Sequence, residues 1–193
     1  MDNNVFEKNI RSHIEVAKKI SADKQALDST LKAVEKIISS IRSGGKMLIC
    51  GNGGSAADAN HLAAEFINRY LKERAPIAAI SLCANTSNIT SIGNDYSFDL
   101  VFSKQVEALG KKNDVLIAIS TSGKSKNIIE ALKAAKEKGV YSILFTGSGK
   151  NECSKLADLS IHVPSDSTPR VQEMHLVLYH VICEMVESET FEK

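Results

Sequence analysis

The spacing of apolar residues changes near residue 44 and divides the chain into two parts. Before that point, apolar side chains recur every three or four residues, which is the spacing of one face of an α-helix. The clearest stripe of this kind comprises Leu27, Leu31, Val34, Ile38 and Ile41. A shorter stripe begins at Phe6, and the polar segment 21–25 is expected to break the helix between the two. Gly44 and Gly45 then stop the helix, so an N-terminal helical arm is predicted over residues 1–44.

From residue 46 the pattern becomes one of short apolar runs that alternate with helical stretches. The runs are nearly continuous in apolar residues, as expected of strands buried on both faces of a parallel sheet, and they cover 46–50, 77–82, 115–119, 141–145 and 159–163. Helices are predicted between and after them, over 55–70, 98–109, 125–138 and 169–189. Residues 45–193 therefore predict an α/β fold, a five-stranded parallel sheet flanked by helices, in a single compact unit with the arm.

Charge, cysteine spacing and hydropathy narrow the class of protein. The 193 residues include 24 basic and 23 acidic side chains, a net charge of +1, so there is no basic excess of the kind that a dedicated nucleic-acid binder usually shows. The four cysteines are scattered and form no CxxC pair. The N-terminus lacks the features of a signal peptide, and no apolar run approaches the roughly 20 residues that span a bilayer. A cytoplasmic protein with reduced cysteines and no membrane partner is expected.

Two polar loops follow the first and third predicted strands, where an open parallel sheet binds its ligand. The first, Gly51–Ser55, holds three glycines that permit positive φ and close approach of a ligand to the backbone. Ser55 is expected to cap the following helix, whose free N–H groups attract anions. The dinucleotide fingerprint is matched only loosely, with Ala56 at its last position, and no acidic residue ends the second strand to hold a ribose. No nucleotide cofactor is therefore expected.

The second loop, Ser120–Ser125, carries four hydroxyl groups in six residues directly before a predicted helix. An ordinary polar loop needs only one serine to cap a helix, whereas several hydroxyls and helix-start N–H groups together suit a phosphate monoester. Lys124 could add positive charge. This loop predicts an anion site at the end of the third strand.

Titratable residues cluster on two of the predicted helices. His61 and Glu65 lie four residues apart, so both project from one face of the helix over 55–70, and Asp58 and Arg69 continue that face. The terminal helix carries Gln172, Glu173, His175 and His180. His180 stands in an apolar stretch, where a core histidine is the ordinary interpretation, and spacing alone does not bring this helix to the ligand crevice. Asn94 and Asp95 are expected in a polar loop after the second strand.

Four segments together resemble one known family. In chain order they are CGNGGSAADANHLAAEF, SIGNDY, ISTSGKSKNI and RVQEMHLVLYH, and they are similar to the bacterial phosphoheptose isomerases of the sugar isomerase (SIS) domain group. The resemblance covers nearly the whole chain. It implies a flavodoxin-like three-layer fold, and the conversion of sedoheptulose 7-phosphate to D-glycero-D-manno-heptose 7-phosphate for lipopolysaccharide or other surface sugars. It also implies a cytoplasmic homotetramer with active sites at subunit boundaries.

The resemblance also assigns roles to individual residues. Glu65 and His180 would be the acid–base pair. The phosphorylated seven-carbon sugar would contact Asn52, Gly53, Gly54, Ser55, Glu65, Asn94, Asp95, Ser120, Thr121, Ser122, Ser125 and Gln172. Zinc would be held by His61, Glu65, Gln172 and His180. Gln172 and His180 are eight residues apart, about 12 Å along a helix, so one metal ion meets both only if their side chains lean together. Thr168 and Pro169 stand where some relatives carry an acidic residue, and a carboxylate role there is not implied.

Two other functions stay open at the level of sequence. A regulator of replication initiation, which binds the initiator protein, shares this fold and a similar first loop. Its pattern lacks the acid–base pair, so the presence of Glu65 and His180 favours an enzyme. An isomerase of the same group that acts on another phosphosugar would carry similar loops, and the sequence separates that function poorly.

Overall fold

The computed structural model describes residues 3–191, and within them it contains the predicted parallel sheet. The strands are β1 (Met47–Gly51), β2 (Ala79–Ser81), β3 (Val115–Ser120), β4 (Tyr141–Thr146) and β5 (Leu159–His162). All neighbouring strands pair in parallel, in the order β2-β1-β3-β4-β5. The α/β fold expected from the apolar runs is confirmed, with every strand within two residues of its predicted ends.

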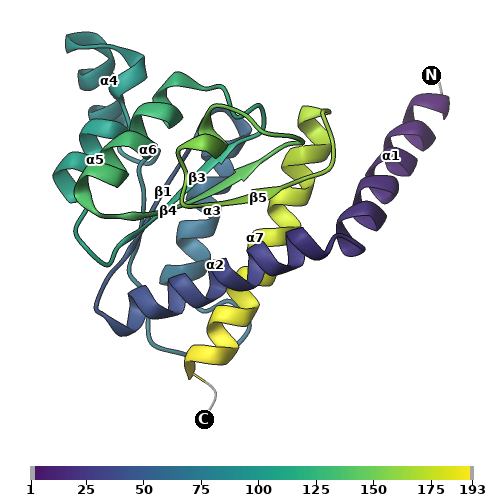
Figure 1. Cartoon of the computed structure of the whole chain (residues 1–193), viewed down its shortest axis with the longest axis horizontal. Coiled ribbons are helices and arrows are strands. Elements are labelled where there is room, and N and C mark those ends of the chain that lie inside the picture. The colour runs from purple at the N-terminus through teal and green to yellow at the C-terminus, as the bar shows by residue number, and fades with distance from the viewer. Residues whose placement is uncertain (1–2, 192–193) are drawn as a thin grey trace.

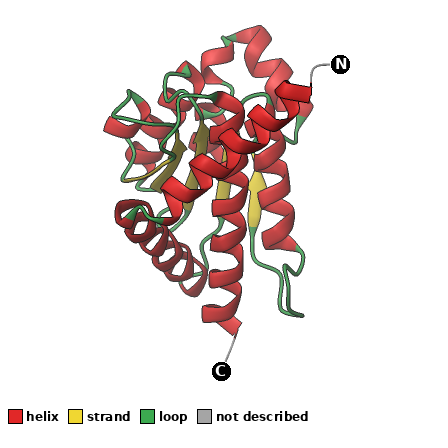
Figure 2. Ribbon diagram, turned by 90° about the vertical axis from the view of Figure 1, so that its right-hand side faces the viewer, coloured by secondary structure: helices red, strands yellow, loops and turns green. Residues whose placement is uncertain are grey.

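Helices cover both faces of this sheet (Figure 1 and Figure 2). They are α1 (Asn3–Ser21), α2 (Lys24–Arg42), α3 (Gly54–Ile67), α4 (Thr86–Asp95), α5 (Ser103–Leu109), α6 (Lys126–Lys138) and α7 (Thr168–Phe191). Side chains of β1 alternate between two cores, as the pleat of a strand requires. Met47 and Ile49 join the core under α2, α3 and α7, whereas Leu48 and Cys50 join the core under α5 and α6. None of the helices over 3–191 is long and apolar enough to cross a membrane.

The N-terminal arm breaks where the polar segment 21–25 predicted. Asp23 caps α2 by accepting hydrogen bonds from the backbone N–H groups of Gln25 at 2.9 Å and Ala26 at 3.2 Å, an arrangement that satisfies two of the four free donors at a helix start. Helix α2 then packs against the sheet and buries Ile37 completely. Helix α1 extends away from the sheet (Figure 1).

Two local predictions are wrong. The segment around Asn94 and Asp95 is not a loop, because residues 86–95 form α4. Its sequence is rich in Asn, Ser and Thr, which look like turn residues, but Asn85 uses its side chain to cap the helix by accepting from Asn88 N–H at 3.1 Å. The helix expected over 98–109 is divided into a 3₁₀ turn, Phe98–Leu100, and α5.

Candidate active site

Helices α3 and α7 bring three of the predicted site residues together. His61 and Glu65 project from α3, and His180 projects from α7 beside them, with one potential ligand atom of each lying within 4.8 Å of the others. His61 Nε2 lies 2.9 Å from Glu65 Oε1. The rings of His61 and His180 meet edge to face, with centroids 5.2 Å apart. The terminal helix α7 therefore packs beside α3, which the spacing of residues along the sequence could not predict.

The two histidines of α7 have different surroundings. His175 is the core histidine: it is fully buried against Phe145, and burial lowers its pKa to about 4. His180 is only partly buried. Burial and the neighbouring His61 lower the pKa of His180, while the Glu65 carboxylate opposes the shift. The interpretation of His180 as a core residue is wrong, and at neutral pH its imidazole is uncharged, with one nitrogen able to donate and the other to accept.

Two tyrosines that the sequence pattern does not mark as site residues flank this cluster. Tyr179 is fully buried, and its hydroxyl group lies 3.0 Å from His61 Nδ1. The ring of Tyr70 lies against His180 at a tilt of 30°, with centroids 5.7 Å apart. Tyr179 stands next to His180 in the sequence, but a tyrosine in an apolar stretch looks like an ordinary core residue.

The side chain of Gln172, a residue of α7, lies apart from His180 and packs beside the first turn of α3. Its Nε2 donates to Asp58 Oδ2 at 3.1 Å, and burial raises the pKa of that Asp58 carboxyl. Gln172 also packs against Gly54, where any added Cβ would collide with its amide group. The eight residues from Gln172 to His180 correspond to about 12 Å of helix. Within one chain, therefore, three of the four proposed zinc ligands come together and Gln172 pairs with Asp58 instead.

The first glycine-rich loop is joined to α6 by an amide pair. Asn52 and Asn127 exchange two hydrogen bonds of 2.8 Å each, which join this loop to the start of α6. Gly53 precedes α3 with φ of 53°, a left-handed value that favours glycine. The expectation that Ser55 caps α3 is wrong, because Gly53 occupies the cap position and Ser55 lies buried inside the first turn. The N–H groups at this helix start consequently have no side-chain cap.

The hydroxyl-rich loop after β3 also ends at an open helix start. Ser125 is the cap residue of α6 but makes no side-chain cap bond, and its Oγ lies 3.4 Å from Ser120 Oγ. Ser120 Oγ accepts from Gly123 N–H at 3.2 Å and Ser122 Oγ from Lys124 N–H at 3.3 Å. Hydroxyl groups and uncapped N–H groups thus converge at the N-terminus of α6, as a phosphate site requires.

Asn94 and Asp95 lie elsewhere, on the last turn of α4. Both residues are exposed, and Asn94 Nδ2 donates to Asp95 Oδ1 at 2.8 Å. Their assignment to a substrate site is untested by these contacts and remains a prediction.

A buried ion pair, which no sequence motif indicates, fixes the C-terminal end of α3 to α7. Arg74 donates to Glu187 at 2.9 Å and to the backbone carbonyl groups of Glu65 at 2.8 Å and Phe66 at 2.9 Å. Glu187 also accepts three backbone N–H groups from residues 70–72. Burial opposes ionisation of Glu187, but these hydrogen bonds outweigh it and hold its pKa below the ordinary value. The pair satisfies the free carbonyl groups at the end of α3 and holds Glu65 in place relative to α7.

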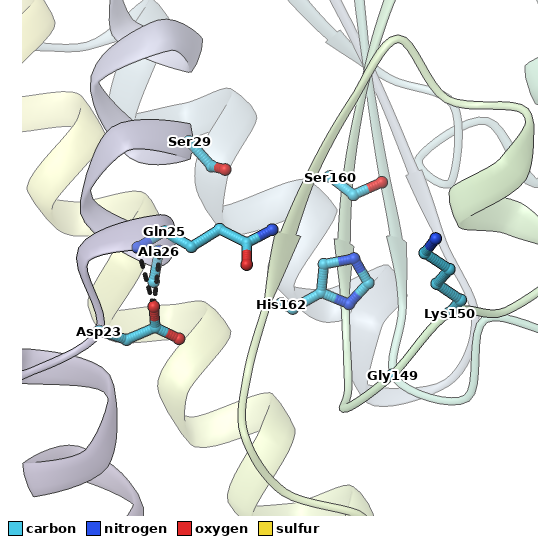
Figure 3. A pocket seen from close by; sticks show the side chains of 8 residues that line it. All are labelled: Asp23, Gln25, Ala26, Ser29, Gly149, Lys150, Ser160 and His162. Carbon is cyan, nitrogen blue, oxygen red and sulfur yellow. Dashed lines mark hydrogen bonds between the residues drawn. The ribbon is translucent and has the colours of Figure 1, made fainter.

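A separate polar cleft of about 290 Å³ lies between α2 and β5 (Figure 3). It is lined by residues that include Gln25, Lys150 and His162. His162 Nδ1 faces the carbonyl group of Gly147 at 3.1 Å. None of the sequence-predicted site residues lines this cleft, so it does not belong to the site on α3 and α7.

Comparison with known proteins first defines the class. The family model of the SIS domain matches residues 10–147. The chain is 48% identical to a phosphoheptose isomerase of Clostridium acetobutylicum over 97% of this chain and 96% of that protein, and 49% identical to one of Campylobacter jejuni over 95% and 97%.

Solved structures narrow the class to one family. The phosphoheptose isomerase of Neisseria gonorrhoeae matches with a TM-score of 0.90 at 40% identity, over 96% of this chain and 98% of that one. The enzyme of Francisella tularensis matches with a TM-score of 0.92 at 31% identity, over 97% and 100%. The chain belongs to the phosphoheptose isomerase family of SIS-domain proteins.

Proposed function

We propose that this protein is an aldose–ketose isomerase that converts sedoheptulose 7-phosphate to D-glycero-D-manno-heptose 7-phosphate. One observation carries the proposal: Glu65 and His180, separated by more than a hundred residues, lie together beside His61. Membership of the phosphoheptose isomerase family supports the same reaction. The alternative function, regulation of replication initiation, does not require an acid–base pair. The proximity of Glu65 and His180 therefore gives it no support.

The residue types match the proton transfers of the reaction. Interconversion of a ketose and an aldose moves a proton between C1 and C2 through an enediol. The Glu65 carboxylate can remove and return that proton, and an uncharged His180 can donate to one oxygen and accept from another. Acid–base groups of this kind typically contribute about 10²–10⁴-fold each to the rate.

The phosphate group of the substrate would bind at the loop Ser120–Ser125. The uncapped N-terminus of α6 and the hydroxyl groups of Ser120 and Ser125 support this placement, because a phosphate dianion needs several donors together. The amide pair of Asn52 and Asn127 keeps the neighbouring loop close to it.

The residues of the cluster also fit a zinc ion. Two imidazoles and one carboxylate form a donor set that is common in catalytic zinc sites, and His61, Glu65 and His180 present one atom each within 4.8 Å of the others. Gln172 would complete the ligand set that the family resemblance implies. When bound, zinc would polarise the sugar carbonyl group and stabilise negative charge on its oxygen.

The proposed assembly is a homotetramer with active sites between subunits. Helix α1 exposes a row of large apolar side chains, including Phe6 at 73% and Ile10 at 49% of their full accessibility. An apolar groove of about 370 Å³ continues between α1, α2 and α7. Contiguous apolar surface of this kind is typical of subunit interfaces.

The length of the substrate supports a shared site. Ser55 and Glu65 are ten residues apart on α3, about 15 Å along its axis. The eight bonds from C1 of a heptose phosphate to its phosphorus atom span only about 9 Å when extended. Substrate contacts at the loop end of α3 and an acid–base pair from different subunits would shorten this gap. A neighbouring chain would likewise supply Gln172, which does not reach the cluster of its own chain.

The product would enter the synthesis of lipopolysaccharide or related surface sugars. All four cysteines are free thiols, which supports a reducing, cytoplasmic setting.

Turnover of sedoheptulose 7-phosphate by the purified full-length protein tests the proposal directly. Activity should appear with zinc and fall on treatment with a chelator, and hexose and amino-sugar phosphates assayed in parallel should react more slowly. Absence of turnover by the wild-type protein, with or without added zinc, would reject the isomerase. Faster turnover of another phosphosugar would assign the second alternative, and binding of a replication initiator without any sugar turnover would assign the regulator.

A further inference from the structure

The buried hydroxyl group of Tyr179 contacts the cluster through a single hydrogen bond. Its oxygen lies 3.0 Å from His61 Nδ1, inside the core formed by α3, α7 and the sheet. The tyrosine side chain is fully buried, whereas the His61 side chain is 42% exposed, so the bond ties an exposed imidazole to the core. The phenol ring also packs edge to face against both imidazoles, with centroids 5.7 Å from His61 and 4.9 Å from His180.

The hydrogen-bond partners of His61 define where its proton lies. Nε2 faces Glu65 Oε1 at 2.9 Å, and an ionised carboxylate can only accept, so Nε2 must carry hydrogen. In a neutral imidazole the other nitrogen, Nδ1, is then an acceptor, and Tyr179 must donate to it. Both ring nitrogens of His61 are consequently committed, and the ring is held between Tyr179 and Glu65.

A tyrosine hydroxyl group can also accept, and this matters if Nε2 binds a metal ion. Nε2 would then present its lone pair, Nδ1 would carry the hydrogen, and Tyr179 would accept it without any movement of the two rings. A partner on the second nitrogen is what usually fixes the orientation and basicity of a metal-binding histidine.

From this geometry we infer that Tyr179 is a positioning residue, which holds the His61 ring in the orientation that presents Nε2, and not Nδ1, to Glu65. The metal-dependent part of this inference rests on the zinc site of the proposed function. The part that concerns the orientation of His61 in the metal-free protein does not depend on that zinc site.

Tyr179→Phe tests the inference because it removes one oxygen and keeps the ring. Tyr70→Phe is the matched control, since it removes the phenol oxygen of the other tyrosine that packs against His180 while retaining the ring contact and the backbone bond from Tyr70 N–H to Glu187. Both variants are compared with the wild type as full-length, metal-free protein with ¹⁵N-labelled histidine, and the His61 signals are assigned by their loss in His61→Asn. Circular dichroism confirms that each variant is folded.

The nitrogen shifts of His61 should show hydrogen on Nε2 in the wild type and in Tyr70→Phe, and a mixture of tautomers in Tyr179→Phe. Zinc affinity, measured by competition with a chromophoric chelator, should fall about 10–100-fold in Tyr179→Phe and stay unchanged in the control. Identical His61 shifts in Tyr179→Phe and the wild type would overturn the inference. A wild type that binds no zinc would remove the metal from the proposed function, and the nitrogen shifts would still decide the role of Tyr179.

Discussion

Removal of the charge on Glu187 should destabilise the protein far more than any surface change on the same helix. In Glu187→Gln one carboxylate oxygen becomes an NH₂ group. In the wild type each carboxylate oxygen accepts two hydrogen bonds: Oε1 from Tyr70 N–H and Arg74, and Oε2 from Leu71 and Lys72 N–H. Whichever oxygen is replaced, two donors then face a donor, and Arg74 is left buried without its counter-ion.

The expected loss can be stated as a free energy. The Arg74 and Glu187 side chains are only 2% and 3% exposed, so solvent screens them little, and breaking one partner of such a pair typically costs about 3–5 kcal/mol. For a chain of about this size each kcal/mol lowers the melting temperature by roughly 2–4 °C. Glu187→Gln should therefore melt about 6–20 °C below the wild type.

Thermal unfolding at matched protein concentration measures this shift, because subunit association also contributes to stability. Glu189→Gln is the control: it lies on the same helix, is exposed, and should change stability by less than about 0.5 kcal/mol. A melting temperature for Glu187→Gln within about 2 °C of the wild type, no larger than the shift expected for the control, would refute the structural role of the pair.

The pH dependence gives a second check on the same pair. The pKa of Glu187 is depressed in the folded state, so its contribution is fully present above the pKa of an unfolded glutamate and is lost as the pH falls through the folded value. The stability difference between the wild type and Glu187→Gln should accordingly shrink as the pH falls below the ordinary glutamate range. A difference that stays constant through that range would contradict the ionised state of Glu187.

Three further changes test the proposed site. Glu65→Gln should lower kcat by about 10²–10⁴-fold in the sugar-phosphate assay without changing the melting temperature or the oligomer mass, and near-normal turnover would exclude Glu65 as the base. Ser125→Ala should raise KM about 10–100-fold with kcat preserved, because a hydrogen bond to a charged phosphate is worth about 1.5–3 kcal/mol; an unchanged KM would exclude that contact. Gly54→Ala should displace the Gln172 amide, which its Cβ would meet, and raise KM by up to about tenfold; a crystal structure of the variant with Gln172 still bonded to Asp58 would contradict this explanation.

The fold was predictable because its signals are local. Each buried strand is a short apolar run, and the arm shows its periodicity and its break at Asp23 within a few residues. Helix α4 was missed for the same reason: its Asn, Ser and Thr residues form a local pattern typical of turns, and Ile89 and Ile92 make only a two-residue apolar stripe. The helix start at Gly53 was likewise misjudged, because Ser55 looks like a cap but lies two residues beyond the cap position, inside the first turn.

The site was only partly predictable, because its pairs join residues distant in sequence. His61 and Glu65 share one helix face, and spacing alone reveals them. Their partners Tyr179 and His180 come from the terminal helix, and no local pattern distinguishes a buried tyrosine that serves a histidine from one that fills a core. The family resemblance supplied His180, but it could not supply Tyr179.

Arg74 and Glu187 show most clearly why residues of this kind cannot be identified from the sequence alone. Arg74 follows Ile67, the last residue of α3, by seven positions and lies in a charged segment typical of a solvent-exposed loop. Glu187 lies near the C-terminal end of α7, where charged residues are frequent. Their importance arises only when α3 and α7 pack side by side, since Arg74 then caps the carbonyl group of Glu65 itself. The same packing that creates the acid–base cluster also creates its support, so the geometry of Glu65 depends on α7 twice: through His180 at the cluster, and through Glu187 at the end of α3.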